Sequence, residues 1–177
     1  MAIKIFIDQG HNPTGFHNTG ASGFGLFEQD VTYNVGIYLR DLLNGDPRFD
    51  ARVSRPSPNT VLGTNNSTSL IERVNMANNW PADYFISIHC NANENPNING
   101  SEVYIYHQYS QANWLAERVL DGIVEAVGTK DNGVRINTIF YVLRRTRMPA
   151  ILVELAYITN ESDNQKLRGD QWQFADG

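Results

Sequence analysis

Short apolar runs alternate along the chain with longer segments in which apolar residues recur at helical spacing. The short runs are rich in β-branched and aromatic residues, a composition that predicts buried strands. They cover residues 3–7, 49–54, 84–89, 102–106, 139–143 and 150–153. The clearest run, 84–89, is apolar on both faces, as the interior of a parallel sheet requires.

Three segments between these runs predict helices. Residues 28–43 place apolar side chains at a helical period and end before Asn44-Gly45, and residues 112–127 do so before Gly128. A helix is expected over 70–79, because Ser69 and Glu72 have the spacing of a capping box. The glycine-rich stretch after the first strand predicts a loop. Strands that alternate with helices predict one α/β domain, with helices on both faces of the sheet.

Composition narrows the class of protein. With 177 residues, 41% hydrophobic and 19% charged, the chain has the make-up of one globular domain. The net charge of -5 argues against nucleic acid as a partner. One cysteine, Cys90, excludes an intramolecular disulfide and an all-cysteine zinc cluster.

The two ends of the chain and its hydropathy bear on where it works. No stretch is long enough to span a bilayer, so no membrane partner is expected, and the opening residues lack the pattern of a signal peptide. We expect a protein made in the cytoplasm, or a domain of a longer chain. Residues 171–177 favour the longer chain, since they read as the start of an apolar helix.

Four residues that carry chemistry fall where an α/β sheet places ligands, beyond the carboxyl ends of its strands. His11 follows the first strand, His89 closes the central one, and Glu154 closes the last one. Glu28 begins the first long helix, and the glycine loop before it could fold it back over the sheet. Two imidazoles and a carboxylate suit a zinc ion that keeps one position for water. Glu154 could then move a proton between that water and a leaving amine.

Simpler explanations exist for each residue taken alone. A histidine at a strand end is often a hydrogen-bonded structural residue, and Glu28 is equally explained by the helix dipole, worth about 0.3–1 kcal/mol. Glu154 is harder to explain in this way, because a carboxylate leaving a core strand needs a partner. His17 and His107 have no comparable placement and are expected on the surface. These residues alone leave the zinc site undecided.

A set of motifs in a fixed order carries more information than any one of them. They are Ile7-Asp8-Gln9-Gly10-His11-Asn12, Gly20-Ala21, Gly25-Leu26-Phe27-Glu28, Ser54-Arg55, Ser69-Leu70-Ile71-Glu72-Arg73, Ala77-Asn78, Ile86-Ser87-Ile88-His89-Cys90-Asn91-Ala92-Asn93, Val142-Leu143-Arg144, Met148-Pro149-Ala150-Ile151-Leu152-Val153-Glu154-Leu155 and Thr159-Asn160. Through them the chain resembles, nearly end to end, the zinc-dependent N-acetylmuramoyl-L-alanine amidases of the amidase 3 type. That family occurs in bacterial autolysins, sporulation enzymes and phage endolysins.

The resemblance implies one Zn2+ held by His11, Glu28 and His89, with Glu154 as the catalytic glutamate. It implies a twisted, mostly parallel (mixed) sheet of about six strands, and hydrolysis of the amide between N-acetylmuramic acid and L-alanine in bacterial peptidoglycan. Arg73 and Asn91 are motif positions that packing and hydrogen bonding around the site explain well.

The chain also departs from the family pattern. Asn12-Pro13 stands where members often carry a second glycine, and the final helix looks incomplete. We therefore expect residues 1–177 to be a catalytic domain, working as a monomer and separated from a C-terminal wall-binding module. The missing export signal favours action on the wall after release, in phage or mother-cell lysis. Two rival readings remain, a carboxypeptidase-like zinc peptidase and a non-catalytic wall-binding domain with structural zinc.

Overall fold

A computed structural model describes residues 1–177 and places six strands in one sheet, in the order β4-β1-β5-β8-β6-β7. The strands are β1 (Ile3–Gln9), β4 (Phe49–Val53), β5 (Tyr84–Asn91), β6 (Ser101–Ile105), β7 (Asp131–Ile136) and β8 (Ala150–Tyr157). All neighbouring strands run parallel except β6 and β8, which are antiparallel. The expectation of a mostly parallel, mixed sheet in an α/β domain is confirmed.

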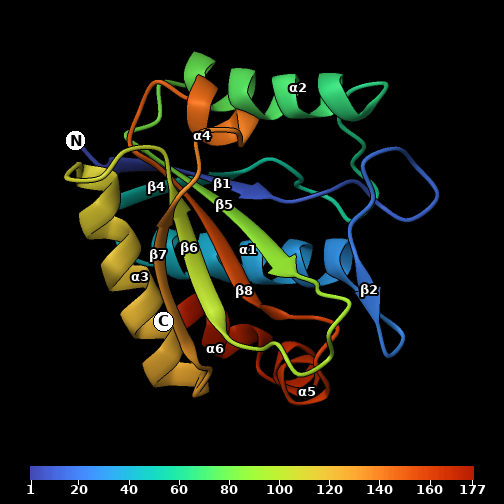
Figure 1. The fold of residues 1–177 in the computed structure, drawn as a ribbon. Coiled ribbons are helices and arrows are strands. Elements are labelled where there is room, and N and C mark those ends of the chain that lie inside the picture. Colours follow the sequence, from blue (N-terminus) through green and yellow to red (C-terminus); the bar gives the residue numbers. More distant parts are fainter.

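Helices cover both faces of this sheet (Figure 1). One face carries α1 (Glu28–Asn44), α3 (Gln111–Val127), α5 (Glu161–Gly169) and α6 (Gln171–Asp176), and we call it the α1 face. The other carries α2 (Asn66–Asn79) and α4 (Tyr141–Arg145), and we call it the α2 face. A small hairpin of β2 (Ser22–Gly23) and β3 (Leu26–Phe27) precedes α1. None of the helices combines the length and apolarity needed to cross a membrane.

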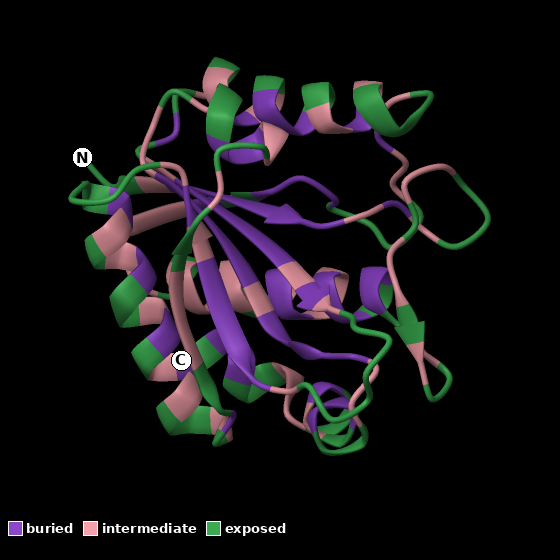
Figure 2. Cartoon of the chain, viewed as in Figure 1, coloured by how far each residue is buried: buried purple, intermediate pink, exposed green.

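Side chains alternate between the two faces along each strand, so the central strands are apolar on both. Ile7, Ile88 and Val153 belong to the core under the α1 face. Phe85 and Leu152 belong to a smaller core under α2 and α4. Further along the strands the α2 face turns polar, and Figure 2 shows intermediate exposure near the end of β5 and in the middle of β8. The helices on this face therefore leave its carboxyl-terminal half open.

One expectation for the segment between α3 and β8 was wrong, and one strand there was not predicted. The run 139–143 is not a strand, since residues 141–145 form α4 and bury Val142 and Leu143. A short apolar run fits a buried helix as well as a strand. The true edge strand is β7, where Asn132-Gly133 resembles a turn but lies in an irregularity of the pairing with β6, with Gly133 at a φ of +86°.

The α2 amino terminus also differs from the expectation. The helix begins at Asn66, and the capping box joins Asn65 to Thr68 rather than Ser69 to Glu72. Ser69 is buried inside the helix, where its hydroxyl accepts hydrogen bonds from Asn18 and Arg73. Ser69, the expected N-cap, therefore makes buried hydrogen bonds inside the helix instead of capping it.

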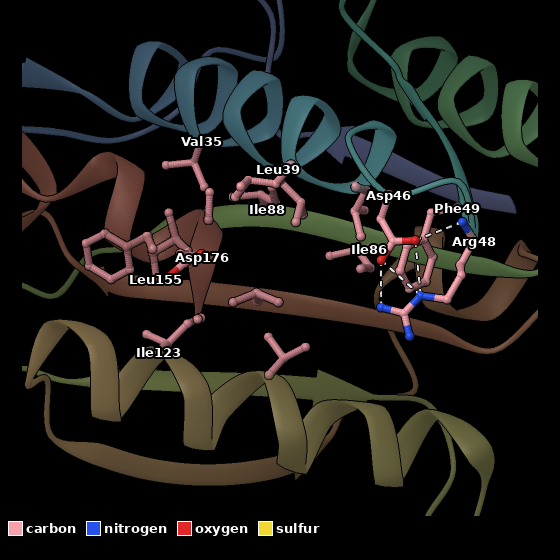
Figure 3. Close-up of a pocket in the computed structure, with 17 residues that line it drawn as sticks. Val35, Leu39, Asp46, Arg48, Phe49, Ile86, Ile88, Ile123, Leu155 and Asp176 are labelled. Carbon is pink, nitrogen blue, oxygen red and sulfur yellow. Dashed lines mark hydrogen bonds and ion pairs between the residues drawn. The ribbon is translucent and has the colours of Figure 1, made fainter. Parts of the chain in front are cut away.

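An apolar cavity of about 490 Å³ lies between α1, α3 and the end of α6 (Figure 3). Ile88, Val153 and Leu155 line it from the sheet. These residues belong to the core under the α1 face, whereas His89 and Glu154 follow them in sequence and point to the opposite face. The cavity is therefore separated from the polar positions by the sheet itself.

Candidate metal centre

Three side chains distant in sequence converge at the open end of the sheet. His11 follows β1, Glu28 is the first residue of α1, and His89 lies in β5. His11 Nε2 is 3.0 Å from Glu28 Oε1, His89 Nδ1 is 3.1 Å from the same oxygen, and the two nitrogens are 3.2 Å apart. The structure thus brings together the three residues expected as ligands, and together they can hold a metal ion.

The spacing of these atoms suits zinc. Tetrahedral zinc binds nitrogen and oxygen at about 2.0–2.1 Å, which puts neighbouring ligand atoms about 3.3 Å apart. The three observed distances, from 3.0 to 3.2 Å, are close to that value. Both histidine side chains remain about 20% exposed, so the centre is open to solvent on one side.

Backbone groups fix the Glu28 carboxylate. The Ala21 amide donates to Oε2 at 2.8 Å and the Cys90 amide donates to Oε1 at 2.9 Å. Burial alone would raise the pKa of Glu28, but hydrogen bonds from His11 and His89, together with their charge, hold that pKa well below its usual range. Glu28 is therefore an anion in place, as a metal ligand must be.

His11 is held from the side away from the centre. Its Nδ1 lies 3.3 Å from the Asn18 carbonyl, which favours a proton on Nδ1, so Nε2 is the nitrogen that a metal could take in place of its contact with Glu28. Its backbone carbonyl accepts a hydrogen bond from Arg73 at 2.7 Å, and its φ is +70°. A non-glycine residue in this region costs energy and persists where the surroundings impose it.

Asp8 and Arg73 form the buried support under this loop. Their side chains are each 1% exposed and pair at 2.6 Å, and Ser87 donates to the second oxygen of Asp8 at 2.8 Å. Burial opposes the charge on Asp8, but Arg73 outweighs it and lowers the pKa of that carboxyl. The structural role expected for Arg73 fits these contacts.

Glu154 lies next to the centre. The sequence predicts it at the end of a strand, and the structure places it elsewhere. It is in the middle of β8, level with His89 on the neighbouring β5, which itself continues to Asn91. Glu154 Oε2 is buried and has no hydrogen-bond partner. Burial, and then the charges of Glu28 and Glu102, raise its pKa well above the usual value. Glu154 thus keeps one carboxyl oxygen without a hydrogen-bond partner, on the strand next to that of His89.

Glu102, which sequence reasoning missed, is the cross-strand neighbour of Glu154 on β6. It is 1% exposed and accepts hydrogen bonds from Asn91 at 2.6 Å and Tyr104 at 2.8 Å. Arg135 lies 3.1 Å from its other oxygen. Burial and the bond to Glu102 raise the pKa of Tyr104 to about 12. The signal available in the sequence was a glutamate at the start of an apolar strand.

The remaining polar candidates lie outside the centre. His107 is exposed, as expected, whereas His17 is partly buried and its Nε2 lies 3.0 Å from the Leu62 carbonyl. Asn12 is buried, and its side chain both donates to and accepts from the Leu62 backbone at 3.0 Å. The departure at this position therefore ties the loop that carries His11 to the loop before α2.

Comparisons with known proteins agree on the family. The sequence profile of the amidase 3 family, described as N-acetylmuramoyl-L-alanine amidase, matches residues 5–177. The chain is 40% identical to N-acetylmuramoyl-L-alanine amidase LytC of Bacillus subtilis (strain 168), covering 93% of this chain and 31% of that protein. It is 30% identical to the endolysin of Bacillus phage SPP1, covering 97% of this chain and 61% of the endolysin.

A solved structure shows the same fold. N-acetylmuramoyl-L-alanine amidase from Clostridium difficile 630 superposes with a TM-score of 0.85 at 30% identity, over 98% of this chain and 90% of that chain. The curated relatives are longer, and the chain spans from about a third to about three fifths of their length.

Proposed function

This chain belongs to the amidase 3 family of N-acetylmuramoyl-L-alanine amidases, and on that basis we propose that it cleaves the amide between N-acetylmuramic acid and L-alanine in peptidoglycan. We further propose that one zinc ion, held by His11, Glu28 and His89, serves this reaction. The observation that supports the proposal most is the convergence of these ligand atoms within 3.2 Å of one another, beside the uncommitted Glu154.

Bound zinc would supply Lewis acidity toward the amide carbonyl and toward an attacking water. Glu154 supplies the proton transfers: Oε2 takes a proton from the water that attacks the carbonyl carbon, and then delivers it to the departing L-alanine nitrogen. Its burial, with no partner at Oε2, leaves that oxygen available for both steps. The fixed Glu28 carboxylate and the oriented His11 ring keep the ligands in place throughout.

The two rival readings share parts of this site. A carboxypeptidase-like peptidase would use the same ligand types, but would cut a peptide bond within the stem. A structural zinc site is more often closed by four protein ligands. Here three protein ligands converge, on a side that remains partly exposed, which favours a catalytic centre.

The setting of the enzyme is a proposal as well. The named relatives include an N-acetylmuramoyl-L-alanine amidase of Bacillus subtilis and a phage endolysin, and both are longer than this chain. We propose that residues 1–177 act as the catalytic domain beside a wall-binding module. Under this proposal the module contributes targeting to the wall, and the chemistry stays with the residues described above.

Product analysis of digested cell walls tests the activity. Purified protein loaded with zinc is expected to release new amino-terminal L-alanine and to leave the glycan strands intact. New termini at other stem residues would indicate a peptidase, and wall binding without any new termini would indicate a binding domain. A chelator should abolish the release, and added zinc should restore it.

Glu154→Gln separates chemistry from metal binding. We expect the variant to retain zinc, because the ligands are other residues, and to lose at least about a hundredfold in rate, as general acid–base catalysis contributes roughly 10²–10⁴. Zinc content and rate are measured on the same preparation. Retained activity would remove Glu154 from the mechanism, and lost zinc would make it a ligand.

A further inference from the structure

A strip of polar side chains crosses the open half of the α2 face, starting at the proposed metal ligand His89 and leading away from it. It runs from His89 on β5 over Glu154 on β8 and Glu102 on β6 to Arg135 on β7. These four residues, which we call the polar strip, come from four adjacent strands of one sheet. Neighbouring strands lie about 4.8 Å apart, so Glu102 is two strands, roughly 10 Å, from the strand of His89.

Glu102 fixes the position of Arg135. Its carboxylate is 1% exposed, and one of its oxygens is already occupied by Asn91 and Tyr104. The other oxygen lies 3.1 Å from a terminal nitrogen of Arg135. A buried carboxylate that is held in this way orients the guanidinium over the strip, rather than leaving it to move freely in solvent.

Arg135 has donors to spare. A guanidinium offers five N–H groups, and here Nε donates to the Asn132 carbonyl at 3.3 Å while one terminal nitrogen meets Glu102. No other group of the chain accepts from it, and half of its side chain is exposed. Its free edge therefore faces solvent next to the proposed reaction centre, in a geometry that matches a carboxylate.

The segment that carries Arg135 is basic in sequence and lies between Asp131 and Glu154. Residues 132–153 contain four arginines and no acidic residue, although the whole chain carries a net charge of -5. Arg144, Arg145 and Arg147 are the other three, and all are exposed. The Glu102 side chain is 1% exposed and its Oε2 has an ion pair to Arg135 but no hydrogen bond, whereas half of the Arg135 side chain is exposed, so a ligand from solvent meets the guanidinium first.

We propose that Arg135, oriented by Glu102, binds the free α-carboxylate of the second stem-peptide residue and so makes the enzyme prefer stems that carry it. This inference rests on the proposed amidase function. In peptidoglycan the residue after L-alanine is D-glutamate joined through its γ-carboxyl, and many walls amidate the remaining α-carboxylate to give D-isoglutamine. That group lies about two residue lengths, roughly 7 Å, from the bond to be cut. The Arg135 guanidinium reaches back to Glu102, which is one strand from Glu154.

A matched pair of substrates tests the proposal. Both are N-acetylmuramoyl-L-alanyl peptides with a third residue blocked as its amide, and they differ only in D-glutamate against D-isoglutamine at position two. For the unaltered enzyme we expect a KM about tenfold or more lower on the D-glutamate substrate, the factor expected from one charge-assisted hydrogen bond. Arg135→Gln should raise KM on that substrate to the D-isoglutamine value, with kcat little changed on either.

Controls separate this role from others. Arg118→Gln, which removes an exposed arginine of α3, should leave both KM values unchanged. A D-isoglutamine substrate with a free terminal carboxylate shows whether that other anion is bound instead. Equal KM values in the unaltered enzyme, or an equal loss on both substrates in Arg135→Gln, would overturn the proposal. If the unaltered enzyme cleaves neither substrate, it is the amidase function that fails.

Discussion

At the scale of single residues, two glycines leave space for the side chains of His89 and Glu28, two of the proposed metal ligands. A Cβ on Gly10 would lie 2.5 Å from His89 Cε1 and 2.6 Å from the Ile88 carbonyl oxygen. A Cβ on Gly20 would lie 2.6 Å from Glu28 Oε2. Real Cβ atoms do not approach other atoms so closely, so a side chain at either position must move a ligand.

Gly10→Ala is therefore expected to weaken zinc binding without touching a ligand. Displacing His89 should lower the affinity about 10–100-fold, the range seen when groups behind metal ligands are changed. A competition titration with a chromogenic chelator measures it. Gly169→Ala is the matched control, since a Cβ there meets nothing within 4 Å. Unchanged affinity in Gly10→Ala would show that the ring can relax at no cost.

The buried Asp8–Arg73 pair predicts a pH-dependent contribution to stability. The folded-state pKa of Asp8 lies below its unfolded value, near 3.9, so the stabilisation is fully present above that pH and is lost as the pH falls through the folded value. Asp8→Asn keeps the shape but leaves Arg73 unpaired, and should reduce the free energy of unfolding at neutral pH by about 3–5 kcal/mol.

Urea unfolding at several pH values measures this effect. The difference in free energy of unfolding between Asp8→Asn and the unaltered protein should narrow on acidification below about pH 4. Asp121→Asn, whose partner Arg118 is 3.7 Å away at the surface, serves as control and should stay within about 0.5 kcal/mol. A gap that stays constant with pH would mean that Asp8 acts through packing alone.

Residue placement together with the family resemblance predicted which side chains converge at the candidate site, and topology supplied the rest. His11, His89 and Glu154 were recognisable because polar residues follow apolar runs, and Glu28 because it starts a helix after a glycine loop. Glu102 was not recognisable in this way. Its importance comes from the antiparallel pairing of β6 with β8, which sets it opposite Glu154, and spacing along the chain does not reveal which strands become neighbours.

At the scale of elements, the start of α2 shows how local signals compete. Two capping patterns overlap there, and the structure uses Asn65 with Thr68. Asn65→Ala should lower the free energy of unfolding by about 1 kcal/mol, because the Thr68 amide loses its acceptor. Ser67→Ala, an exposed position in the same turn, is the control and should be near neutral. Chemical denaturation measures the free energy of unfolding of both variants. An equal loss in Asn65→Ala and Ser67→Ala would show that Asn65 is not the stabilising cap.

The short elements after α3 were the least predictable. β7 is an edge strand with a glycine at a positive φ, and α4 has only five residues. Neither is long enough to show a period, so tertiary contacts decide their form. Phe140, just before α4, packs edge-on against Tyr104 of β6 at 5.2 Å between ring centroids. This contact links α4 to the same strand that carries Glu102.

At the scale of the whole molecule, the proposed zinc ion should join three parts of the chain that only the fold brings together. Its proposed ligands are His11, which follows β1, Glu28, the first residue of α1, and His89 in β5. The unfolded chain does not present them as a set, so zinc should bind the folded state preferentially. Binding then adds to stability by mass action, about 2.7 kcal/mol at a free zinc concentration one hundred times Kd.

For a domain of this size, that free energy corresponds to a rise in Tm of roughly 5–10 °C. Thermal unfolding with zinc and with chelator measures the rise, and His89→Ala should abolish it because only two ligands remain. His107→Ala removes an exposed histidine outside the centre, and this variant should keep the zinc-dependent rise in Tm. A rise that survives in His89→Ala would place the metal elsewhere. Stability, unlike activity, reports the metal centre without any substrate, so this result and the wall-digestion result can fail independently of each other.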